Sequence, residues 1–439
     1  MFTKDSFDRF GDDLCQLLLQ YLPIDDRLRL QSVSKQWLAL IFNTQTDLVF
    51  DGKLLHTMSL NSRRDYYQTI KLFKLIVSKC PNITAVTICD GSTLPGAVHM
   101  ISHYMNLLIK YCYRLRHISI TLDYDGLWSV IDRTFERFFW RFGQQLLTFK
   151  FHGTNHDFNK QLFYEVVDGM PNLKSLDITF DSYESTVQLN DILIDNMCYL
   201  LPESLQSLNI KLDESSMTLF AKFAYIFGQQ LTSLTIMFEQ LTADDEDYDG
   251  NDEWPNWYKW DLNPLSAGLA QMPRLKQLKF DLPTDFSINF IGDLFATIGP
   301  NCRQLKALDY ESNISSVVTI GRMFSAINKH MSKQLKRLTI KCMDYTDRDT
   351  DLLLTSDLLN RLKGLTHLRL EFYYFQTIGD QFFGNIHRNH PRLQSIYCDN
   401  VFITDESIQA MGQLTHLTDV YLSYENRQMA LKNIKVENI

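Results

Sequence analysis

The sequence lacks several features that would place it in a familiar class. Its 439 residues include only eight cysteines and no CxxC pair, which argues against a disulfide scaffold. No apolar run approaches the ~18 residues that span a membrane, and the first residues do not resemble a signal peptide. A basic excess is also missing, because the formal net charge is -9. We therefore expect an intracellular protein, in the cytoplasm or nucleus, that binds neither membrane nor nucleic acid.

Motifs of common enzymes and metal sites are absent as well. The sequence contains no G-x-x-x-x-G-K, no G-x-S-x-G and no HExxH. His99 with His103 and His387 with His390 have helical spacing, but neither pair has a third ligand nearby in the sequence. Paired histidines of this kind usually lie on solvent-exposed helix faces. We expect no catalytic residue, no metal and no cofactor.

The sequence does contain an internal repeat. A hexamer with apolar residues at positions one, four and six recurs twelve times. The hexamers begin at Ile83, Leu115, Leu146, Leu173, Leu205, Leu231, Leu275, Leu305, Leu335, Leu365, Leu393 and Leu417. Their spacing is nearly uniform except for one interval of 44 residues between Leu231 and Leu275, which indicates an insertion.

The repeat predicts an α/β fold. Positions four and six of a hexamer lie on the same face of a strand, and they can be buried only if neighbouring strands stack into a parallel sheet. Helix-length segments separate the strands, such as residues 68–79, 98–111, 315–331 and 378–389. Three cysteines that precede hexamers, Cys80, Cys112 and Cys302, are expected to fill the core. The alternation predicts a curved solenoid with right-handed crossovers.

Residues 80–425 resemble the leucine-rich-repeat family, with Pro81, Pro171, Pro273 and Pro391 in the usual approach to the strand. The asparagine of the family's ninth position is present only as Asn313, so we expect an irregular array of about twelve repeats. The resemblance implies a parallel sheet on the concave side, helices on the convex side, and partner binding on the strand face. The predicted substrate-binding residues at hexamer position five are Lys150, Asp177, Lys279, Arg369, Tyr397 and Tyr421.

A separate helical segment precedes the repeats. Leu14, Leu17, Leu18, Tyr21 and Leu22 form one apolar stripe of a helix, and Cys15 and Leu19 add apolar surface on another side. Two further short helices are expected, one through Leu28 and Leu30 and one capped by Ser34, on which Val33, Trp37, Leu40 and Ile41 share a side. Such a small unit with surplus apolar faces is usually completed by a partner.

This segment resembles an F-box. Phe10 occupies the family's leucine position, Leu14, Leu18, Leu19 and Leu22 its first apolar helix, and Asp26 its aspartate. "VSKQW" matches throughout, whereas Gly11 replaces a proline and Arg27 a leucine. The resemblance implies docking on a Skp-type adaptor that joins a cullin and a RING subunit. The expected adaptor-binding residues are Phe10, Leu14, Leu18, Leu22, Leu30, Val33 and Trp37.

An F-box followed by leucine-rich repeats implies the substrate-recognition subunit of an SCF-type ubiquitin ligase, which acts by proximity and without a catalytic residue. The alternatives are a leucine-rich-repeat scaffold whose front helices cap the solenoid, and a GTPase activator, for which no sequence feature singles out the required arginine.

The insertion is acidic and rich in tryptophan. "DEDYDG" from Asp245 fits the head of a calcium loop, but Asn256 stands where the bidentate glutamate should be. Two interpretations remain open. Trp254, Trp257 and Trp260 could contact a basic substrate, or the segment could be a solvated loop with its tryptophans folded back.

These observations predict four regions. Residues 1–47 form the F-box and residues 48–79 a linker and first-repeat cap. Residues 80–425 form the solenoid, with the insertion at 239–261, and residues 426–439 form a C-terminal tail.

Overall fold

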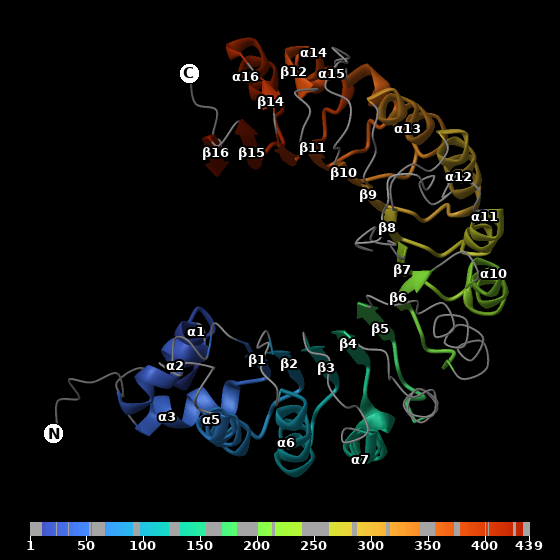
Figure 1. Cartoon of the computed structure of the whole chain (residues 1–439). Coiled ribbons are helices and arrows are strands. Elements are labelled where there is room, and N and C mark those ends of the chain that lie inside the picture. The colour runs from blue at the N-terminus through green and yellow to red at the C-terminus, as the bar shows by residue number, and fades with distance from the viewer. Residues whose placement is uncertain are drawn as a thin grey trace, which may run out of the picture. The chain divides into compact units, whose positions relative to one another are not determined.

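A computed structural model describes the chain as two compact units, residues 1–205 (unit 1) and residues 206–439 (unit 2). The described residues are 11–22, 24–33, 35–51, 54, 66–90, 97–122, 132–154, 169–181, 201–212, 216–238, 263–282, 288–312, 317–342, 356–372, 378–399, 401–402, 404–424 and 427–432. Within each unit the strands form a row, and the longer helices cover one side of it (Figure 1).

Unit 1 begins with a small helical group and continues as a parallel sheet. The group consists of α1 (Asp12–Gln20), α2 (Ile24–Arg29), a 3-10 turn (Leu30–Ser32) and α3 (Lys35–Thr44). The sheet region consists of β1 (Asp47–Phe50), α5 (Tyr66–Lys79), β2 (Ala85–Asp90), α6 (Ala97–Tyr111), β3 (His117–Leu122), α7 (Asp132–Phe142), a 3-10 turn (Gly143–Gln145), β4 (Thr148–Thr154) and β5 (Ser175–Asp181). These strands pair in sequence order, all in parallel.

Unit 2 repeats the same strand and helix alternation. Its elements are β6 (Ser207–Leu212), α10 (Ser216–Phe227), β7 (Ser233–Phe238), α11 (Asn263–Ala270), β8 (Gln277–Leu282), α12 (Ile288–Asn301), β9 (Ala307–Ser312), α13 (Val317–His330), β10 (Arg337–Cys342), a 3-10 turn (Ser356–Leu359), β11 (His367–Phe372), β12 (Ile378–Gly379), α14 (Asp380–Phe383), α15 (Ile386–Asn389), β13 (Ser395–Cys398), β14 (Val401–Phe402), α16 (Asp405–Gly412), β15 (Asp419–Tyr424) and β16 (Arg427–Lys432). In Figure 1, α10 to α13 lie on the convex side of this unit's strands.

The predicted repeat is confirmed, because each of the twelve hexamers leads into a parallel strand two residues after its first residue. Positions one, four and six face the core. In the hexamer of β9, for example, Leu305, Leu308 and Tyr310 are all buried. The alternate positions of the same strand point to the opposite face, as the two-residue period of a strand requires.

Within each unit, a ladder of peptide hydrogen bonds joins successive repeats at hexamer position two. The N–H of a position-two residue donates to the carbonyl of its counterpart in the preceding repeat of the same unit, as Lys306 does to Lys276 (2.8 Å) and Lys336 to Lys306 (2.8 Å). The next N–H along the chain donates to the same carbonyl, as Ala307 does to Lys276 (3.0 Å). The asparagine at the family's ninth position, Asn313, lies outside the described residues.

Before several strands the core accepts small or soft side chains, as predicted for the cysteines. Cys80, Cys112 and Cys302 are buried. Burial raises the pKa of the Cys80 thiol to about 11, and that of Cys112 and of Cys302 to about 12. His390 occupies the same position before β13 and is also buried.

The structure adds elements that the sequence analysis did not anticipate. β1 extends the parallel sheet by one strand before the first hexamer, and β16, within the predicted tail, pairs antiparallel with β15. The predicted helix at 378–389 is instead the short strand β12 followed by α14 and α15. β12 pairs with β14 in a separate two-stranded sheet, which leaves too few residues for a long helix there.

Among the described residues, no helix combines the length and the apolar character needed to cross a membrane.

Candidate functional site

The helical group at the start of unit 1 has its own small core. Cys15 and Leu19 on α1 and Ile41 on α3 are fully buried, and Leu28 and Trp37 are each 5% exposed. α1 packs against α3, which carries its buried residues along one side. The core therefore uses the Cys15 and Leu19 side of α1.

The opposite stripe of α1 is left in solvent. Leu14 is 44% exposed, Leu17 48%, Leu18 40% and Tyr21 80%, and Val33 after α2 is 40% exposed. We call these five residues the α1 stripe. A row of large apolar side chains this exposed is unusual on a small folded unit and makes the α1 stripe a candidate interaction surface.

Arg27, one of the two departures from the F-box pattern, has a structural role. Its Nε donates to the carbonyl of Leu22 (2.7 Å) and its guanidinium donates to Oε1 of Gln45 (3.0 Å). The amide of Gln45 in turn donates to the carbonyl of Asp47, the first residue of β1. Burial lowers the pKa of the Arg27 guanidinium. The arginine therefore ties the end of α1 to the start of the sheet, a link that leucine could not make.

Gly11, the other departure, is the N-cap of α1. Its φ of -68° lies in the range that proline imposes, and a Cβ added there would meet no atom within 4 Å. The backbone at this position is therefore already in the conformation that the F-box proline would adopt.

The seven residues predicted to bind the adaptor fall into different environments. Leu14, Leu18 and Val33 belong to the exposed α1 stripe, whereas Leu22 and Leu30 are partly exposed. Trp37 is buried in the core of the helical group and can support the surface without forming much of it. Phe10 lies outside the described residues.

Residues 7–45 match the F-box domain family. The chain contains an F-box. The match covers α1, α2 and α3 and ends just before β1. It also includes both positions, Gly11 and Arg27, that depart from the pattern.

One solved structure covers nearly the whole chain. A chain in the crystal structure of the Rad7 and Elc1 complex of yeast matches with a TM-score of 0.50 and 12% identity, over 91% of each chain. A protein of Bacteroides fragilis gives a TM-score of only 0.29 at 12% identity, over 82% of this chain and 73% of that one. No curated protein matches the sequence. The first likeness supports the fold of an F-box followed by leucine-rich repeats.

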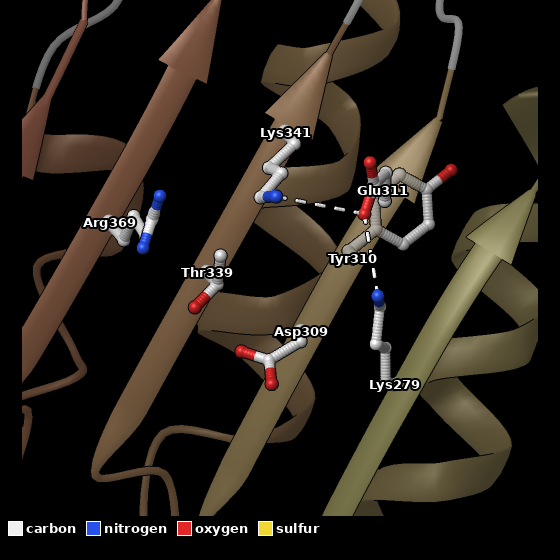
Figure 2. Close-up of a pocket in the computed structure, with 7 residues that line it drawn as sticks. All are labelled: Lys279, Asp309, Tyr310, Glu311, Thr339, Lys341 and Arg369. Carbon is white, nitrogen blue, oxygen red and sulfur yellow. Dashed lines mark ion pairs between the residues drawn. The ribbon is translucent and has the colours of Figure 1, made fainter. Parts of the chain in front are cut away.

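A second candidate surface is the strand face of unit 2, defined by hexamer positions five and seven of β8 to β15. The side chains there form a charge ladder across neighbouring strands (Figure 2). Glu311 lies 3.6 Å from the ammonium of Lys279 and 3.9 Å from that of Lys341. Lys341 also pairs with Glu371 (3.6 Å), which pairs with Arg369. Most of the charges on this face are thus compensated by one another.

A pocket of about 210 Å³ on this face is lined by Lys279, Glu311, Lys341 and Arg369, together with Asp309, Tyr310 and Thr339. Burial raises the pKa of the nearby Asp281 carboxyl, and the charge of Glu311 raises it further, whereas Lys279 and Lys341 lower it. The pocket presents charges of both signs and suits a polar partner surface.

Next to the charge ladder, the strand face of unit 2 carries stacked aromatic rings. The guanidinium of Arg369 lies 4.2 Å from the ring centre of Tyr397, which stacks on Tyr421 at 4.3 Å with an angle of 8°. The Tyr397 hydroxyl donates to Asp399 (3.4 Å). Burial, with the charges of Asp399 and Glu371, raises the pKa of Tyr397, so its hydroxyl stays protonated. Aromatic and arginine side chains of this kind dominate the energetics of protein interfaces.

The structure brings together only some of the predicted substrate-binding residues. Lys279, Arg369, Tyr397 and Tyr421 share the strand face of unit 2. Lys150 and Asp177 form an ion pair of their own (3.8 Å) on β4 and β5 of unit 1. Trp254, Trp257 and Trp260, with the calcium-like segment, lie outside the described residues. Position-seven residues such as Glu311 and Glu371 were missed, although the two-residue period of a strand places them on the same face as position five.

His99 and His103 both lie on α6, where His103 is exposed, whereas His387 is partly exposed and His390 is fully buried. Within the described part of the chain, no cluster of three or more histidine, cysteine, aspartate or glutamate side chains could hold a metal ion.

Proposed function

We propose that this chain is the substrate-recognition subunit of an SCF-type ubiquitin ligase. Its F-box would dock on a Skp-type adaptor, which links it to a cullin and a RING subunit, while the repeats hold a protein substrate. The single observation that supports the proposal best is the coincidence of the F-box match with the exposed α1 stripe.

The α1 stripe has the properties of a docking surface. It is apolar and contiguous, since its α1 members are spaced i, i+3, i+4 and i+7, and the core beneath it is complete without it. Burying four such side chains would contribute several kcal/mol, at roughly 1.5–3 kcal/mol for each fully buried side chain. An adaptor with a complementary apolar groove would satisfy this surface.

The repeats would supply the other half of the function, on the strand face of unit 2. Its compensated charges favour specificity over raw affinity, because a partner must present charges in a matching order. Arg369, Tyr397 and Tyr421 are the expected anchors. The chain would promote ubiquitination by holding a substrate lysine near a charged ubiquitin carrier, and it would contribute no catalytic group.

A solenoid cap without any ubiquitin link is the second candidate, and one observation favours it in part. α3 does contact the first repeat, because Phe42 lies under the ammonium of Lys79 on α5 (5.0 Å) and Asn82, in the turn before β2, donates to the carbonyl of Asn43 (2.8 Å). Capping explains α3. It does not explain why α1 exposes a second apolar stripe.

A pull-down with a purified Skp-type adaptor tests the proposal, with Elc1 as a second bait because Rad7 was solved in complex with it. The informative variant is Leu14→Glu with Leu18→Glu, which charges the α1 stripe without touching the buried core. We expect the full-length chain to bind at least one bait and this variant to lose at least ~100-fold in affinity.

The matched control is Leu75→Glu with Ile226→Glu, because these side chains are 45% and 46% exposed and lie outside the F-box. This control should bind like the unchanged chain. If the unchanged, folded chain binds neither bait, or if both variants bind equally well, the adaptor-binding proposal is wrong.

A further inference from the structure

Unit 2 concentrates positive charge along one edge, where the chain turns into five of its strands. The turns before β8, β9, β10, β11 and β13 are residues 271–276, 300–306, 331–336, 361–366 and 390–394. Together they contain nine lysines and arginines and no aspartate or glutamate. The nine residues, which we call the basic edge, are Arg274, Lys276, Arg303, Lys306, Lys333, Lys336, Arg361, Lys363 and Arg392.

The peptide ladder aligns three of these nine cations at the same position of successive repeats. Lys276, Lys306 and Lys336 occupy hexamer position two in three successive repeats, and each donates or accepts in the same ladder. Neighbouring strands lie ~4.8 Å apart, so the five turns extend over roughly 19 Å. Every member of the basic edge is exposed except Lys336, which is partly exposed. The cations therefore lie on neighbouring turns and are accessible to solvent.

None of the nine forms an ion pair with any described residue. The ion pairs that the structure shows in unit 2 use Lys279, Lys341 and Arg369 of the strand face instead. Two members of the basic edge contact only neutral carbonyls, Lys363 that of Arg388 (2.7 Å) and Arg303 that of Pro300 (3.1 Å). Among the described residues, no carboxylate therefore neutralises the charge of this edge.

The chemistry of the edge selects the kind of partner. The five turns contain no phenylalanine, tyrosine or tryptophan, and their leucines are buried. Protein interfaces are normally enriched in aromatic residues and depleted in lysine, and single-stranded nucleic acids require aromatic stacking. A row of lysine and arginine without either feature matches contacts to a regular line of phosphates.

We propose that the basic edge binds the phosphate backbone of a nucleic-acid duplex, without reading its sequence. Phosphates on one strand follow each other at 3.4 Å along the axis, which allows about one contact per turn over this length. The net charge of -9 describes the whole chain, whereas the screened field at the edge depends mainly on charges within ~8–10 Å of it. This activity lies beyond the substrate-receptor function and does not depend on it.

Fluorescence anisotropy of the full-length chain with a 20-base-pair duplex of random sequence tests the proposal. With about five phosphate contacts, log K should fall with log salt at a slope of about -4.5, or roughly 500-fold between ~50 and ~200 mM salt. The combined variant Lys276→Glu, Lys306→Glu and Lys336→Glu should bind at least ~30-fold more weakly and have a slope shallower by about 2.7.

The matched control changes three exposed cations outside the basic edge, Lys71→Glu, Lys74→Glu and Arg322→Glu, and so alters the total charge equally. It should retain duplex binding, and circular dichroism should show both variants folded. The proposal is overturned if the duplex does not bind at low salt, or if both variants weaken binding equally. Preferential binding to single strands, polyglutamate or anionic vesicles would also overturn it, since each points to a different partner.

Discussion

Helix α1 of the F-box and helix α13 of unit 2 have the same apolar spacing and opposite exposure. On α13, Ile320, Met323, Phe324 and Ile327 follow the i, i+3, i+4, i+7 pattern and are all buried against the strands. On α1, Leu14, Leu17, Leu18 and Tyr21 follow the same pattern and are at least 40% exposed.

The two helices differ in exposure because α1 has apolar residues on a second side and α13 does not. α1 has a second apolar pair, Cys15 and Leu19, which fills the core of the F-box. The strand row buries the one apolar stripe of α13. A helix with two apolar stripes in a small unit keeps one of them for a partner, whereas a helix with one stripe uses it to fold.

Truncating one member of each stripe should separate these roles most clearly. Phe324→Ala should destabilise unit 2 by ~3–5 kcal/mol, because it opens a cavity in a packed core. Leu18→Ala should cost less than ~1 kcal/mol, because its side chain is already partly in solvent. Urea unfolding of the full-length variants, followed by circular dichroism, measures both. Equal costs would show that the α1 stripe is part of a core.

Acid should destabilise unit 2, because it protonates the buried His390. Burial lowers the pKa of its imidazole from 6.5 to about 4; a hydrogen bond with the Leu362 carbonyl opposes the shift and the charge of Lys363 adds to it. The pKa of His390 is lower in the folded chain than in the unfolded chain. The contribution of neutral His390 to the free energy of unfolding is therefore fully present above about pH 6.5 and is lost between pH 6.5 and 4. The loss should approach ~3 kcal/mol.

Replacing His390 by methionine, which other repeats have before the strand, should remove most of this pH dependence. The measurement is the unfolding free energy at several pH values between 4 and 7. His416→Gln, at an exposed position of the same unit, serves as the control and should leave the dependence in place. If the unchanged chain is equally stable at pH 4.5 and 7, His390 is not buried as a neutral group.

Within the F-box, removing the arginine that replaces the family leucine should have a smaller effect. Arg27→Ala removes the hydrogen bonds to Leu22 and Gln45 and should cost ~1–2 kcal/mol. Arg29→Ala is the control, since its ion pair with Asp26 (3.7 Å) is largely exposed and contributes little. Thermal unfolding distinguishes them. A similar melting temperature for both variants would rule out the proposed link between α1 and β1.

The smallest expected effect is an increase in the stability of the F-box. Gly11→Pro should stabilise the F-box by ~0.4–1 kcal/mol, because the N-cap already has a φ of -68° and proline restricts the unfolded chain. The same thermal unfolding experiment measures it. A lower melting temperature would mean that the Gly11 N–H has a partner that proline removes.

Much of the fold could be predicted because the repeat is a local pattern. Each hexamer specifies its strand through two or three buried side chains, and the approach to the strand through residues such as Cys302. The extra strands β1 and β16 could not be predicted because neither contains the hexamer. Each is a strand because it pairs with a neighbour, β1 with β2 and β16 with β15. Segment 378–389 has helical periodicity, but the pairing of β12 with β14 overrides it.

The sites were predictable to a lesser degree. The F-box pattern identified the α1 region, but spacing alone could not show which of its two stripes is buried, since that depends on how α3 packs. On the strand face, position five was chosen and position seven was missed, although Glu311 joins two lysines there. The basic edge could not be predicted from the sequence, because its cations lie in different turns and only the stacking of the repeats brings these turns side by side.

The antiparallel pairing of β16 with β15 has a consequence for self-association. A parallel sheet that ended at β15 would present a row of unsatisfied N–H and C=O groups to any other extended chain. Because Asp419 pairs with Lys432 and Tyr424 with Arg427, β16 occupies those groups along the full length of the strand. An extended chain that added to this end of the described sheet would therefore have to pair with β16, and in place of parallel repeat packing it would meet an antiparallel hairpin.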